Sequence, residues 1–395
     1  MSESASTFDF LAFIEENCPA SMRTPMSQDE TIWGGRQQVF DHADAKAWLD
    51  VMVAAGFTAP TWPKEYGGGG LSEEEAKQLQ RSLYKVKARP PLMSLGVHMM
   101  GPTIMEFGSR EQKAEHLPPI AKGEIRWCQG YSEPGAGSDL ASLNCKALDK
   151  GDHYLVTGQK VWTSFADKSD YLFCLVRTDF AASKHNGISV LLIDMDLPGV
   201  STKPIELISG SSHFCEVFLD QVKVPKRQLL GELNKGWTIA KRMLQHERNM
   251  MGGRNLGDRF SPDIVKSAED HLGGNLKQIA PVLRDRIAHN QMQTTATELT
   301  GSRVMEELKA GYIPQASSCL KLAMSEAYMD KFELYLEAFG FSGLSNLDED
   351  NKGSFSELEM HCAKEWAFSK IQAIGGGTSE IQLNIIAKQN LGLPE

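Results

Sequence analysis

The chain has 395 residues, more than one ordinary hydrophobic core contains, so two or three packed units are expected. With 41% hydrophobic and 23% charged residues, it has the composition of a soluble globular protein. Its net charge of −10 argues against nucleic acid or an anionic membrane as the main partner. Seven cysteines without CxxC spacing predict reduced thiols and no metal site. Without a secretory signal pattern or an apolar run of about 18 residues, we expect a cytoplasmic protein with no membrane insertion.

The N-terminal part of the chain, residues 1–122, is predicted to be an α-helical domain. Within residues 42–56, apolar side chains recur at helical spacing, and Gly56 predicts the end of that helix. A second amphipathic helix is predicted over about 72–86, and a further one begins at Ser109. The apolar positions of the first helix are Ala45, Trp48, Leu49, Met52 and Val53.

The middle part, residues 123–230, contains short segments rich in β-branched and aromatic residues that are separated by turn residues. This pattern predicts a small β-sheet or barrel. Helical periodicity returns at Gly236, so residues 231–395 are predicted to form a C-terminal helical domain. The expected fold is therefore α+β and multidomain, with a β domain between two helical ones. The predicted strands are 153–157, 171–176, 188–193 and 216–219.

The most informative segment for chemistry is 127–139, Trp-Cys-Gln-Gly-Tyr-Ser-Glu-Pro-Gly-Ala-Gly-Ser-Asp. Its Glu-Pro turn and two glycines place Ser132 and Ser138 on a backbone with little side-chain bulk. On such a backbone, main-chain N–H groups and small hydroxyls approach a flat or phosphorylated ligand closely. An ordinary Pro-Gly turn has the same composition, so this segment alone leaves both alternatives open.

A carboxylate is predicted on the apolar face of the helix that follows Gly236. Glu247 is three residues after Leu244 and four before Met251, which belong with Ala240, Met243 and Met250 to the apolar stripe. Burial raises the pKa of a carboxyl and makes it a stronger base, which suits proton abstraction. A Glu in a buried structural ion pair would give the same pattern, so that alternative stays open here. The neighbouring His246 is off the stripe and is expected to be solvated or hydrogen-bonded.

Three segments in this order resemble the signatures of the acyl-CoA dehydrogenase family: 127–139, 158–164 (Gly-Gln-Lys-Val-Trp-Thr-Ser) and 375–382 (Gly-Gly-Gly-Thr-Ser-Glu-Ile-Gln). The resemblance covers nearly the whole chain. It implies the three-domain fold of that family, a bound FAD and an acyl-CoA substrate. It also implies an oxidoreductase that forms a trans-2-enoyl-CoA and passes electrons to an electron-transfer flavoprotein.

The resemblance assigns the catalytic base to Glu247. In most family members a Glu immediately precedes the Gly-Thr of the last signature, but Gly376 occupies that place here. The isovaleryl-CoA and long-chain types instead carry the base on an earlier helix, one residue before an arginine, and Glu247-Arg248 resembles that arrangement. Arg248 resembles the arginine that reaches the CoA moiety. The N–H of Gly376 is implied as a donor to the thioester carbonyl, since that role needs no side chain.

The resemblance also implies which residues would hold the ligands. The segment 129–138 resembles the strand and loop that wrap the flavin, 162–164 resembles the element beside the flavin ring, and 378–380 resembles the loop at the adenosine side. The implied cofactor-binding residues are Gln129, Tyr131, Ser132, Gly137, Ser138, Trp162, Thr163, Ser164, Thr378 and Glu380. The implied substrate-binding residues are Ser138, Arg248 and Gly376.

Two family features are missing, both in the part that a subunit lends to its neighbour's FAD. The usual Arg-x-x-Phe-Gly segment has no recognisable arginine in the corresponding region, 272–280. The usual Gln-x-x-Gly-Gly motif begins with Glu337, and an acid there would repel a pyrophosphate. We expect a dimer of dimers, and these losses favour a heteromer with a second acyl-CoA dehydrogenase-like chain. Some bacterial members that degrade sterol side chains are α2β2 heterotetramers of this kind, and they resemble this chain in carrying the base on the earlier helix.

Two alternatives stay open at this stage. An acyl-CoA oxidase on the same fold would pass electrons to oxygen and release hydrogen peroxide. A partner subunit without chemistry of its own would complete the site of another chain, although Glu247 and the intact 129–138 segment argue against it. The acyl group cannot be read from the sequence. The base on the earlier helix favours a bulky substrate, in fatty acid or sterol side-chain β-oxidation.

Overall fold

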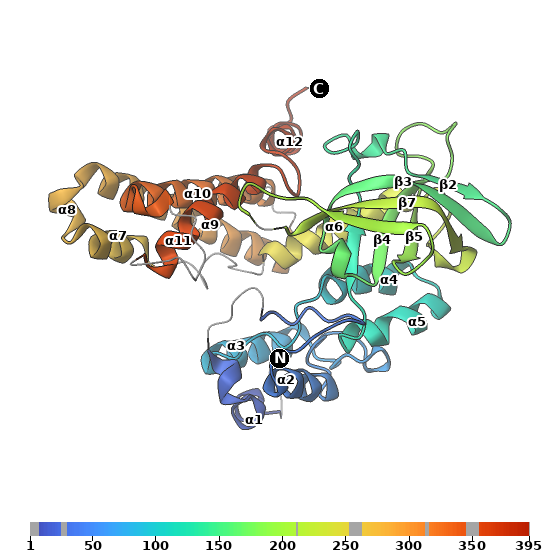
Figure 1. Cartoon of the computed structure of the whole chain (residues 1–395), viewed down its shortest axis with the longest axis horizontal. Coiled ribbons are helices and arrows are strands. Elements are labelled where there is room, and N and C mark those ends of the chain that lie inside the picture. Colours follow the sequence, from blue (N-terminus) through green and yellow to red (C-terminus); the bar gives the residue numbers. More distant parts are fainter. Residues whose placement is uncertain are drawn as a thin grey trace. The chain divides into compact units, whose positions relative to one another are not determined.

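The computed structural model separates into two compact units (Figure 1). The first unit comprises 1–205 and 213–250, and contains the N-terminal helices and the sheet. The second comprises 206–212 and 251–395, and is helical. The expected α+β class, with helices at both ends and a central sheet, is confirmed, while the boundaries at 122 and 230 stay a prediction. The structure describes residues 8–24, 30–210, 212–252, 263–312, 316–344 and 355–394.

The N-terminal helices begin and end where local signals predicted. Ser72 and Ser109 are N-caps, and each forms a capping box with the residue three positions later. Gly56 follows the second helix with a φ of +72°, where a Cβ would lie 2.6 Å from the main chain of Gly68, so only glycine fits. That helix buries the predicted positions except Val53, which is half-buried. The helices are α1 (Phe10–Asn17), α2 (Ala43–Ala54), α3 (Glu73–Val86), α4 (Gly101–Phe107) and α5 (Arg110–Ala121).

One eight-stranded sheet forms the middle of the chain, with strand order β6-β7-β3-β2-β4-β5-β8 and β1 paired in parallel with β4. All four predicted strands are present, and two of them, β3 and β7, are much longer than predicted. The other four were missed because two-to-five-residue strands carry too little periodicity to detect. The strands are β1 (Trp127–Gly130), β2 (Lys146–Asp149), β3 (His153–Ser164), β4 (Tyr171–Arg177), β5 (Ile188–Asp194), β6 (Val200–Pro204), β7 (Phe214–Pro225) and β8 (Leu229–Leu230).

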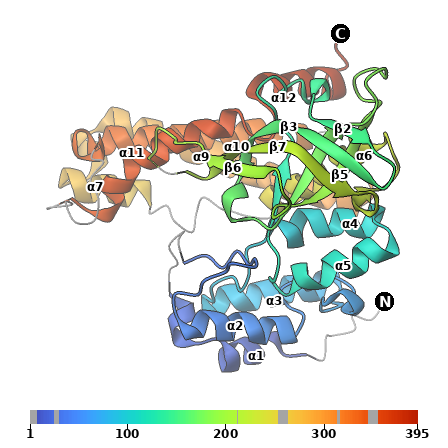
Figure 2. The ribbon, with the colours of Figure 1, turned by 45° about the vertical axis from the view of Figure 1, so that its right-hand side comes forward.

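Strand β4 is buried on both faces, and its side chains alternate between two cores. Phe173 and Leu175 belong to the core that includes the N-terminal helices, whereas Leu172 and Cys174 belong to the core within the sheet. Helices α4 and α5 lie along one face of the sheet in both views (Figures 1 and 2). The sheet is therefore a rigid platform for the loops at its strand ends.

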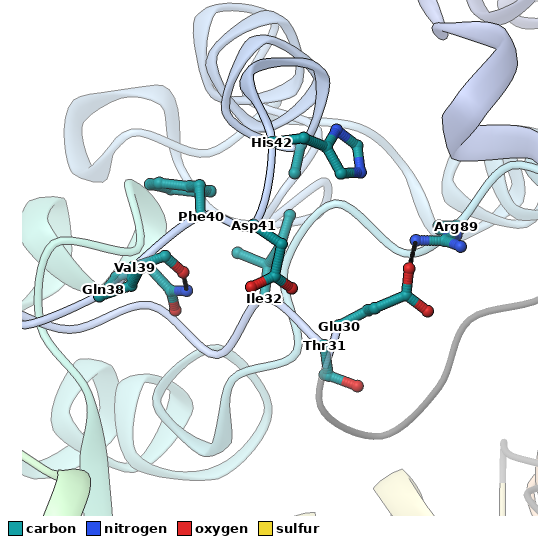
Figure 3. A pocket seen from close by; sticks show the side chains of 10 residues that line it. Glu30, Thr31, Ile32, Gln38, Val39, Phe40, Asp41, His42 and Arg89 are labelled. Carbon is teal, nitrogen blue, oxygen red and sulfur yellow. Dashed lines mark hydrogen bonds and ion pairs between the residues drawn. The ribbon is translucent and has the colours of Figure 1, made fainter. Parts of the chain in front are cut away.

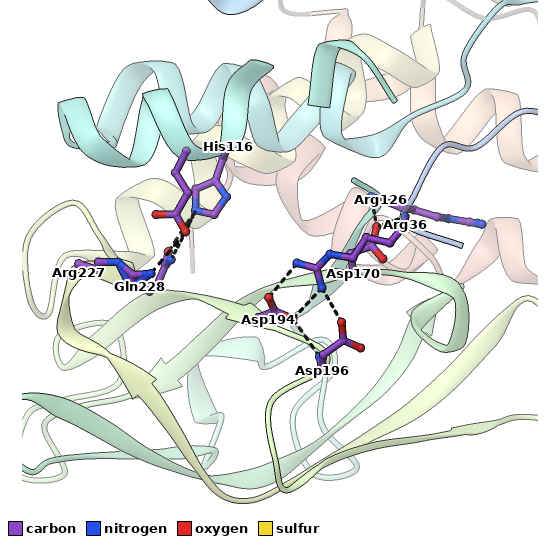
Figure 4. Close-up of polar contacts among 9 residues, drawn as sticks. Arg36, His116, Arg126, Asp170, Asp194, Asp196, Arg227 and Gln228 are labelled. Atoms are coloured by element: carbon purple, nitrogen blue, oxygen red, sulfur yellow. Dashed lines mark hydrogen bonds and ion pairs between the residues drawn. The ribbon is translucent and has the colours of Figure 1, made fainter. Parts of the chain in front are cut away.

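Ion pairs and main-chain bonds attach the N-terminal segment to the sheet (Figure 4). The Arg36 guanidinium lies 2.8 Å from the carboxylate of Asp194 at the end of β5. The carboxylate of Asp170 accepts the main-chain N–H of Arg36 at 3.0 Å and that of Arg126 at 2.7 Å. These bonds connect the N-terminal segment to the start of β1, where the 127–139 segment begins.

The second unit is a set of helices with its own core around Leu334, Tyr335 and Ile287. Its two long helices, α9 and α10, run side by side (Figure 1). No helix within the described ranges is long and apolar enough to span a membrane. All seven cysteines are described and are free thiols; Cys319 is half-buried and the others are buried. The helices are α7 (Ile264–Leu272), α8 (Leu276–Ile279), α9 (Pro281–Lys309), α10 (Ser317–Phe339), α11 (Glu357–Ser369) and α12 (Ser379–Ile385), preceded by α6 (Gly236–Gly252).

Candidate active site

The loop after β1 presents an open backbone. Glu133 and Ala136 exchange two main-chain hydrogen bonds of 3.0 Å, which close a tight turn. A Cβ built on Gly135, within this turn, or on Gly137, just after it, would meet nothing within 4 Å. A ligand can therefore approach the main chain of this loop closely, as the sequence predicted for a flat or phosphorylated group.

The 158–164 segment lies next to that loop and is bulged. The main-chain oxygen of Ser132 accepts a hydrogen bond from the N–H of Val161 at 2.9 Å. Between Lys160 and Thr163, β3 has one residue more than β7, which is a β-bulge. Trp162 sits in this bulge with a φ of 61°, and its side chain is 54% exposed. A left-handed backbone at a bulky exposed residue is a form of strain that concentrates at functional sites.

The three predicted residues of this segment differ in their exposure. The side chain of Thr163 is fully buried, and its Oγ1 finds no hydrogen-bond partner within the described part of the chain. Only the main chain of Thr163 can therefore meet a ligand. Ser164 is half-buried and lines a small pocket. The other residues around that pocket are Trp33, Met93, Leu95, Arg126, Trp127 and Phe165.

A buried cation lies in the pocket beside Ser164. The guanidinium carbon of Arg126 lies 4.9 Å from the ring centre of Trp33 and 4.8 Å from that of Phe165. Burial lowers the pKa of Arg126 to about 10, and its Nη2 has no hydrogen-bond partner among the residues described. The backbone of Phe165 is also left-handed, with a φ of 53°. A positive charge is thus held by aromatic faces at the end of the strained segment.

A buried ion pair stabilises the loop that follows β1. The Lys160 ammonium donates to the Glu133 carboxylate at 2.7 Å and to the main-chain oxygen of Tyr131 at 3.1 Å. The same carboxylate accepts the main-chain N–H groups of Asn144 at 2.6 Å and Cys145 at 2.9 Å. Both oxygens of this buried carboxylate are therefore satisfied, which fixes the turn that follows Ser132.

The predicted base lies close to the end of β1. The ring of Tyr131 is buried, and its hydroxyl donates to the main-chain oxygen of Ala240 in α6 at 3.4 Å. Burial, and then the negative charge of Glu247, raise the pKa of Tyr131 well above its ordinary value. The half-buried Glu247 carboxylate is thus within electrostatic range of this ring. The predicted stripe is confirmed at Ala240 and Met243, which are buried.

His246 precedes Glu247 in α6. His246 is half-buried, and burial, followed by the charge of Arg242, lowers its pKa. Its Nε2 is buried and has no hydrogen-bond partner among the described residues, so at this atom the expectation of a solvated or hydrogen-bonded histidine is not met. The side chains of Arg248, Met250 and Met251 lie outside the described residues.

The C-terminal glycine loop lies in the second unit. Gly376 has a φ of +68°, and a Cβ there would meet nothing within 4 Å, so its main chain is accessible. Thr378 is the N-cap of α12, and its hydroxyl accepts the N–H of Ile381 at 3.3 Å. Glu380 is exposed in the first turn, where a backbone hydrogen bond and then the Thr378 side chain lower its pKa.

Glu337, in the segment that replaces the usual Gln-x-x-Gly-Gly motif, is neutralised by its own chain. Its carboxylate forms an ion pair with Arg286, which comes from α9. Arg286 also lies 3.8 Å from Asp330. This pairing could not be predicted from the sequence, because the two partners are 51 residues apart. The region 272–280 forms the end of α7, a glycine C-cap and α8.

A second pocket lies in the N-terminal part of the chain (Figure 3). The Arg89 guanidinium donates to the Glu30 carboxylate at 3.0 Å on its rim. None of the predicted site residues lines this pocket. Its lining consists of Glu30, Thr31, Ile32, Gln38, Val39, Phe40, Asp41, His42, Ala45 and Arg89.

Comparison with known proteins identifies the family. Profiles of the acyl-CoA dehydrogenase N-terminal, middle and C-terminal domains match residues 28–124, 128–222 and 234–391. Acyl-CoA dehydrogenase IpdE1 of Mycobacterium tuberculosis is 33% identical over 363 residues, which cover 91% of this chain and 90% of IpdE1. The chain belongs to the acyl-CoA dehydrogenase family. It is therefore an oxidoreductase.

Solved structures of acyl-CoA dehydrogenases share the whole fold. The Tcur3481-Tcur3483 steroid ACAD superimposes with a TM-score of 0.76 at 27% identity, over 98% of this chain and 96% of that one. The ChsE4-ChsE5 complex from Mycobacterium tuberculosis superimposes with a TM-score of 0.73 at 27% identity, over 100% of both chains. The similarity thus extends through the helical ends as well as the sheet.

The residues of this acyl-CoA dehydrogenase fit the flavin that the family implies. The open main chain at Gly135 and Gly137 allows close approach, and the exposed ring of Trp162 offers a flat apolar surface. The main-chain oxygen of Ser132 accepts a hydrogen bond from Val161 in β3, the strand that carries this ring. Sequence reasoning missed Glu133, Lys160 and Arg126, whose contacts all depend on residues distant in sequence.

Proposed function

We propose that the protein catalyses FAD-dependent α,β-dehydrogenation of an acyl-CoA thioester to a trans-2-enoyl-CoA, with Glu247 as the base. The observation that carries this proposal is the hydrogen bond from the buried Tyr131 hydroxyl to the main-chain oxygen of Ala240, which joins the end of β1 to α6, the helix of Glu247. The segment proposed for the flavin starts at the same strand end. Gly376 occupies the alternative position of the base and has no side chain to accept a proton.

The roles of the residues follow from their chemistry. The Glu247 carboxylate takes the α-proton of the thioester. The N–H of Gly376 donates to the thioester carbonyl and stabilises the negative charge that develops there. When bound, FAD supplies the acceptor for the β-hydrogen, which leaves as hydride. Arg248 is assigned to the CoA moiety, as a fixed planar cation suited to an anionic ligand.

Two groups of residues would hold FAD. The loop and bulge of the first unit would contact the flavin, with Ser138 shared between flavin and substrate. The first turn of α12 would contact the adenosine side. These residues are Gln129, Tyr131, Ser132, Gly137, Ser138, Trp162, Thr163, Ser164, Thr378 and Glu380.

The substrate and assembly are proposed from the relatives. A bulky acyl-CoA such as a steroid derivative is supported by the similarity to a steroid ACAD. A heteromer with a second chain of this family is supported by the two similar structures named for pairs of chains. The Arg286–Glu337 pair adds support, since it leaves no free cation at that point for a pyrophosphate. An electron-transfer flavoprotein is the proposed electron acceptor.

Anaerobic titration of the FAD-loaded protein with acyl-CoA thioesters tests the proposal. A substrate should bleach the flavin absorbance of the wild type. Glu247→Gln should bind FAD equally but bleach several orders of magnitude more slowly, because an amide cannot accept the α-proton. Glu232→Gln, which alters an exposed carboxylate just before α6, is the matched control and should behave as the wild type. A Glu247→Gln variant that bleaches at more than a few per cent of the wild-type rate would remove Glu247 from this role. Stoichiometric hydrogen peroxide in air would reassign the acceptor to oxygen.

A further inference from the structure

The glycine loop at 375–377 is held in place by a lysine from another helix. The ammonium of Lys321, in α10, donates to the main-chain oxygen of Gln372 at 2.8 Å and to that of Gly377 at 2.7 Å. These two acceptors lie on either side of Gly376 in the sequence. One side chain from a long helix therefore binds the main chain both before and after Gly376.

A second side chain fixes the middle of the same loop. The amide of Gln382, in α12, donates to the main-chain oxygen of Gly376 at 3.2 Å. A Cβ on Gly377 would lie 2.7 Å from this amide nitrogen, and the φ of Gly377 is +101°, so only glycine fits there. The peptide groups on both sides of Gly377 are thus restrained by hydrogen bonds from side chains.

Such restraint matters because consecutive glycines are conformationally free. Ordering any residue costs backbone entropy, and ordering a glycine costs the most. A donor that stabilises charge in a transition state is effective only when it is already oriented before the reaction. Lys321 is partly desolvated, and this burial lowers its pKa, so its position has an energetic cost. Its two hydrogen bonds to main-chain oxygens offset this cost.

We propose that Lys321 is a positioning residue for the dehydrogenation. Its ammonium holds the loop so that the N–H of Gly376 is oriented toward the thioester carbonyl of the substrate. This role rests on the proposed function of Gly376 as carbonyl donor. Lys321 does not touch the substrate and acts through the backbone of the loop.

Infrared spectroscopy of a bound thioester tests this role without turnover. In the assembled, FAD-loaded Glu247→Gln protein, an acyl-CoA with a ¹³C-labelled thioester carbonyl should show a lowered C=O stretching frequency, because the N–H of Gly376 polarises the bond. Adding Lys321→Met should abolish most of this shift. Lys321→Arg, which keeps a cationic donor, should retain it, and Lys321→Gln should give an intermediate shift. Lys266→Met, an exposed lysine on α7, is the control and should change nothing.

Two further measurements separate positioning from a general structural effect. In a background with Glu247 intact, Lys321→Met should lower kcat by about 10- to 100-fold with a smaller change in KM, less than the full loss of a carbonyl donor. Hydrogen exchange in the peptide that contains 374–378 should accelerate, even without substrate.

The infrared experiment has two outcomes that decide between the proposals. A lowered C=O frequency in Glu247→Gln that survives Lys321→Met overturns the inference about Lys321. Absence of any lowered frequency in Glu247→Gln itself overturns the proposed role of Gly376 instead. If Lys321→Met does not fold, the same comparison with Lys321→Gln decides.

Discussion

The ammonium of Lys160 and the carboxylate of Glu133 form a 2.7 Å ion pair in which Lys160 is fully buried and Glu133 is 8% exposed. This pair lies under the loop that carries Ser132. Removing one partner leaves an uncompensated buried charge, so Lys160→Met or Glu133→Gln should each lower the free energy of unfolding by about 3–5 kcal/mol. Urea unfolding followed by circular dichroism measures this loss.

The double variant and an exposed pair provide the controls. Lys160→Met with Glu133→Gln should lose less than the sum of the single losses, because no charge is then left unpaired. The exposed Lys184–Asp139 pair has a similar distance of 3.0 Å. Lys184→Met should change stability by less than about 1 kcal/mol. Equal effects at the two pairs would show that the buried pair has no special role.

The left-handed backbone of Trp162 predicts opposite effects on stability and on ligand binding. Trp162→Gly removes the φ strain, and little burial is lost because the ring is half exposed, so Tm should stay equal or rise. FAD affinity should fall by at least about tenfold, since the flat ring that would pack against the flavin is gone. Calorimetry and fluorescence titration with FAD measure the two effects.

Gln221 is a matched control for that substitution. It also has a left-handed backbone, with a φ of 51°, and it lies in β7. Gln221→Gly should relieve strain in the same way without changing FAD affinity. If Trp162→Gly bound FAD as tightly as the wild type, the flavin would not lie against this ring.

His116 should make stability depend on pH (Figure 4). Its Nε2 bonds to the Gln228 amide oxygen at 3.1 Å, and its ring is fully buried. Burial lowers its pKa below the ordinary value of 6.5. Between those two values the folded protein binds fewer protons than the unfolded chain, so stability is fully present above pH 6.5 and is lost as the pH falls toward the lower pKa.

Replacing the ring should remove this dependence. In His116→Gln, the urea midpoint should fall less between pH 7 and pH 5 than in the wild type, although the variant is less stable at pH 7. His42 is not among the buried residues, and His42→Gln should leave the wild-type pH profile unchanged. Parallel pH profiles for the wild type and His116→Gln would assign the acid sensitivity to other groups.

The occupied Arg286–Glu337 pair predicts incomplete FAD loading in a homomer. The chain expressed alone should bind clearly less than one FAD per subunit, because its contribution to a neighbour's pyrophosphate site is missing. Coexpression with a complete acyl-CoA dehydrogenase-like partner should restore one FAD per heterodimer. Absorbance at the flavin band with chromatography and light scattering gives both ratios. A homotetramer with stoichiometric FAD and full activity would contradict this prediction.

Local signals allowed much of the fold to be predicted. Ser72 and Ser109 followed by Glu or Gln three residues later are helix starts that depend only on neighbours in sequence. The apolar stripe containing Ala240 and Met243 is likewise local. Short strands such as β2 were missed because their pairing, not their composition, defines them.

The supporting contacts of the site could not be predicted in the same way. Lys160 finds Glu133 across 27 residues, and Lys321 finds Gly377 across 56. Single side chains of this kind carry no periodic pattern, so only the folded chain reveals which backbone they hold. The strained φ of Trp162 depends on a register shift between β3 and β7, which the motif does not encode by itself.

One natural cysteine is more accessible than the other six and can carry a spectroscopic label. Six cysteines are buried and Cys319 is half-buried on α10, two residues before Lys321. A thiol-directed fluorophore should therefore attach first at Cys319, without any engineered cysteine. The attached dye would then report, in real time, when the helix that anchors the glycine loop changes its surroundings.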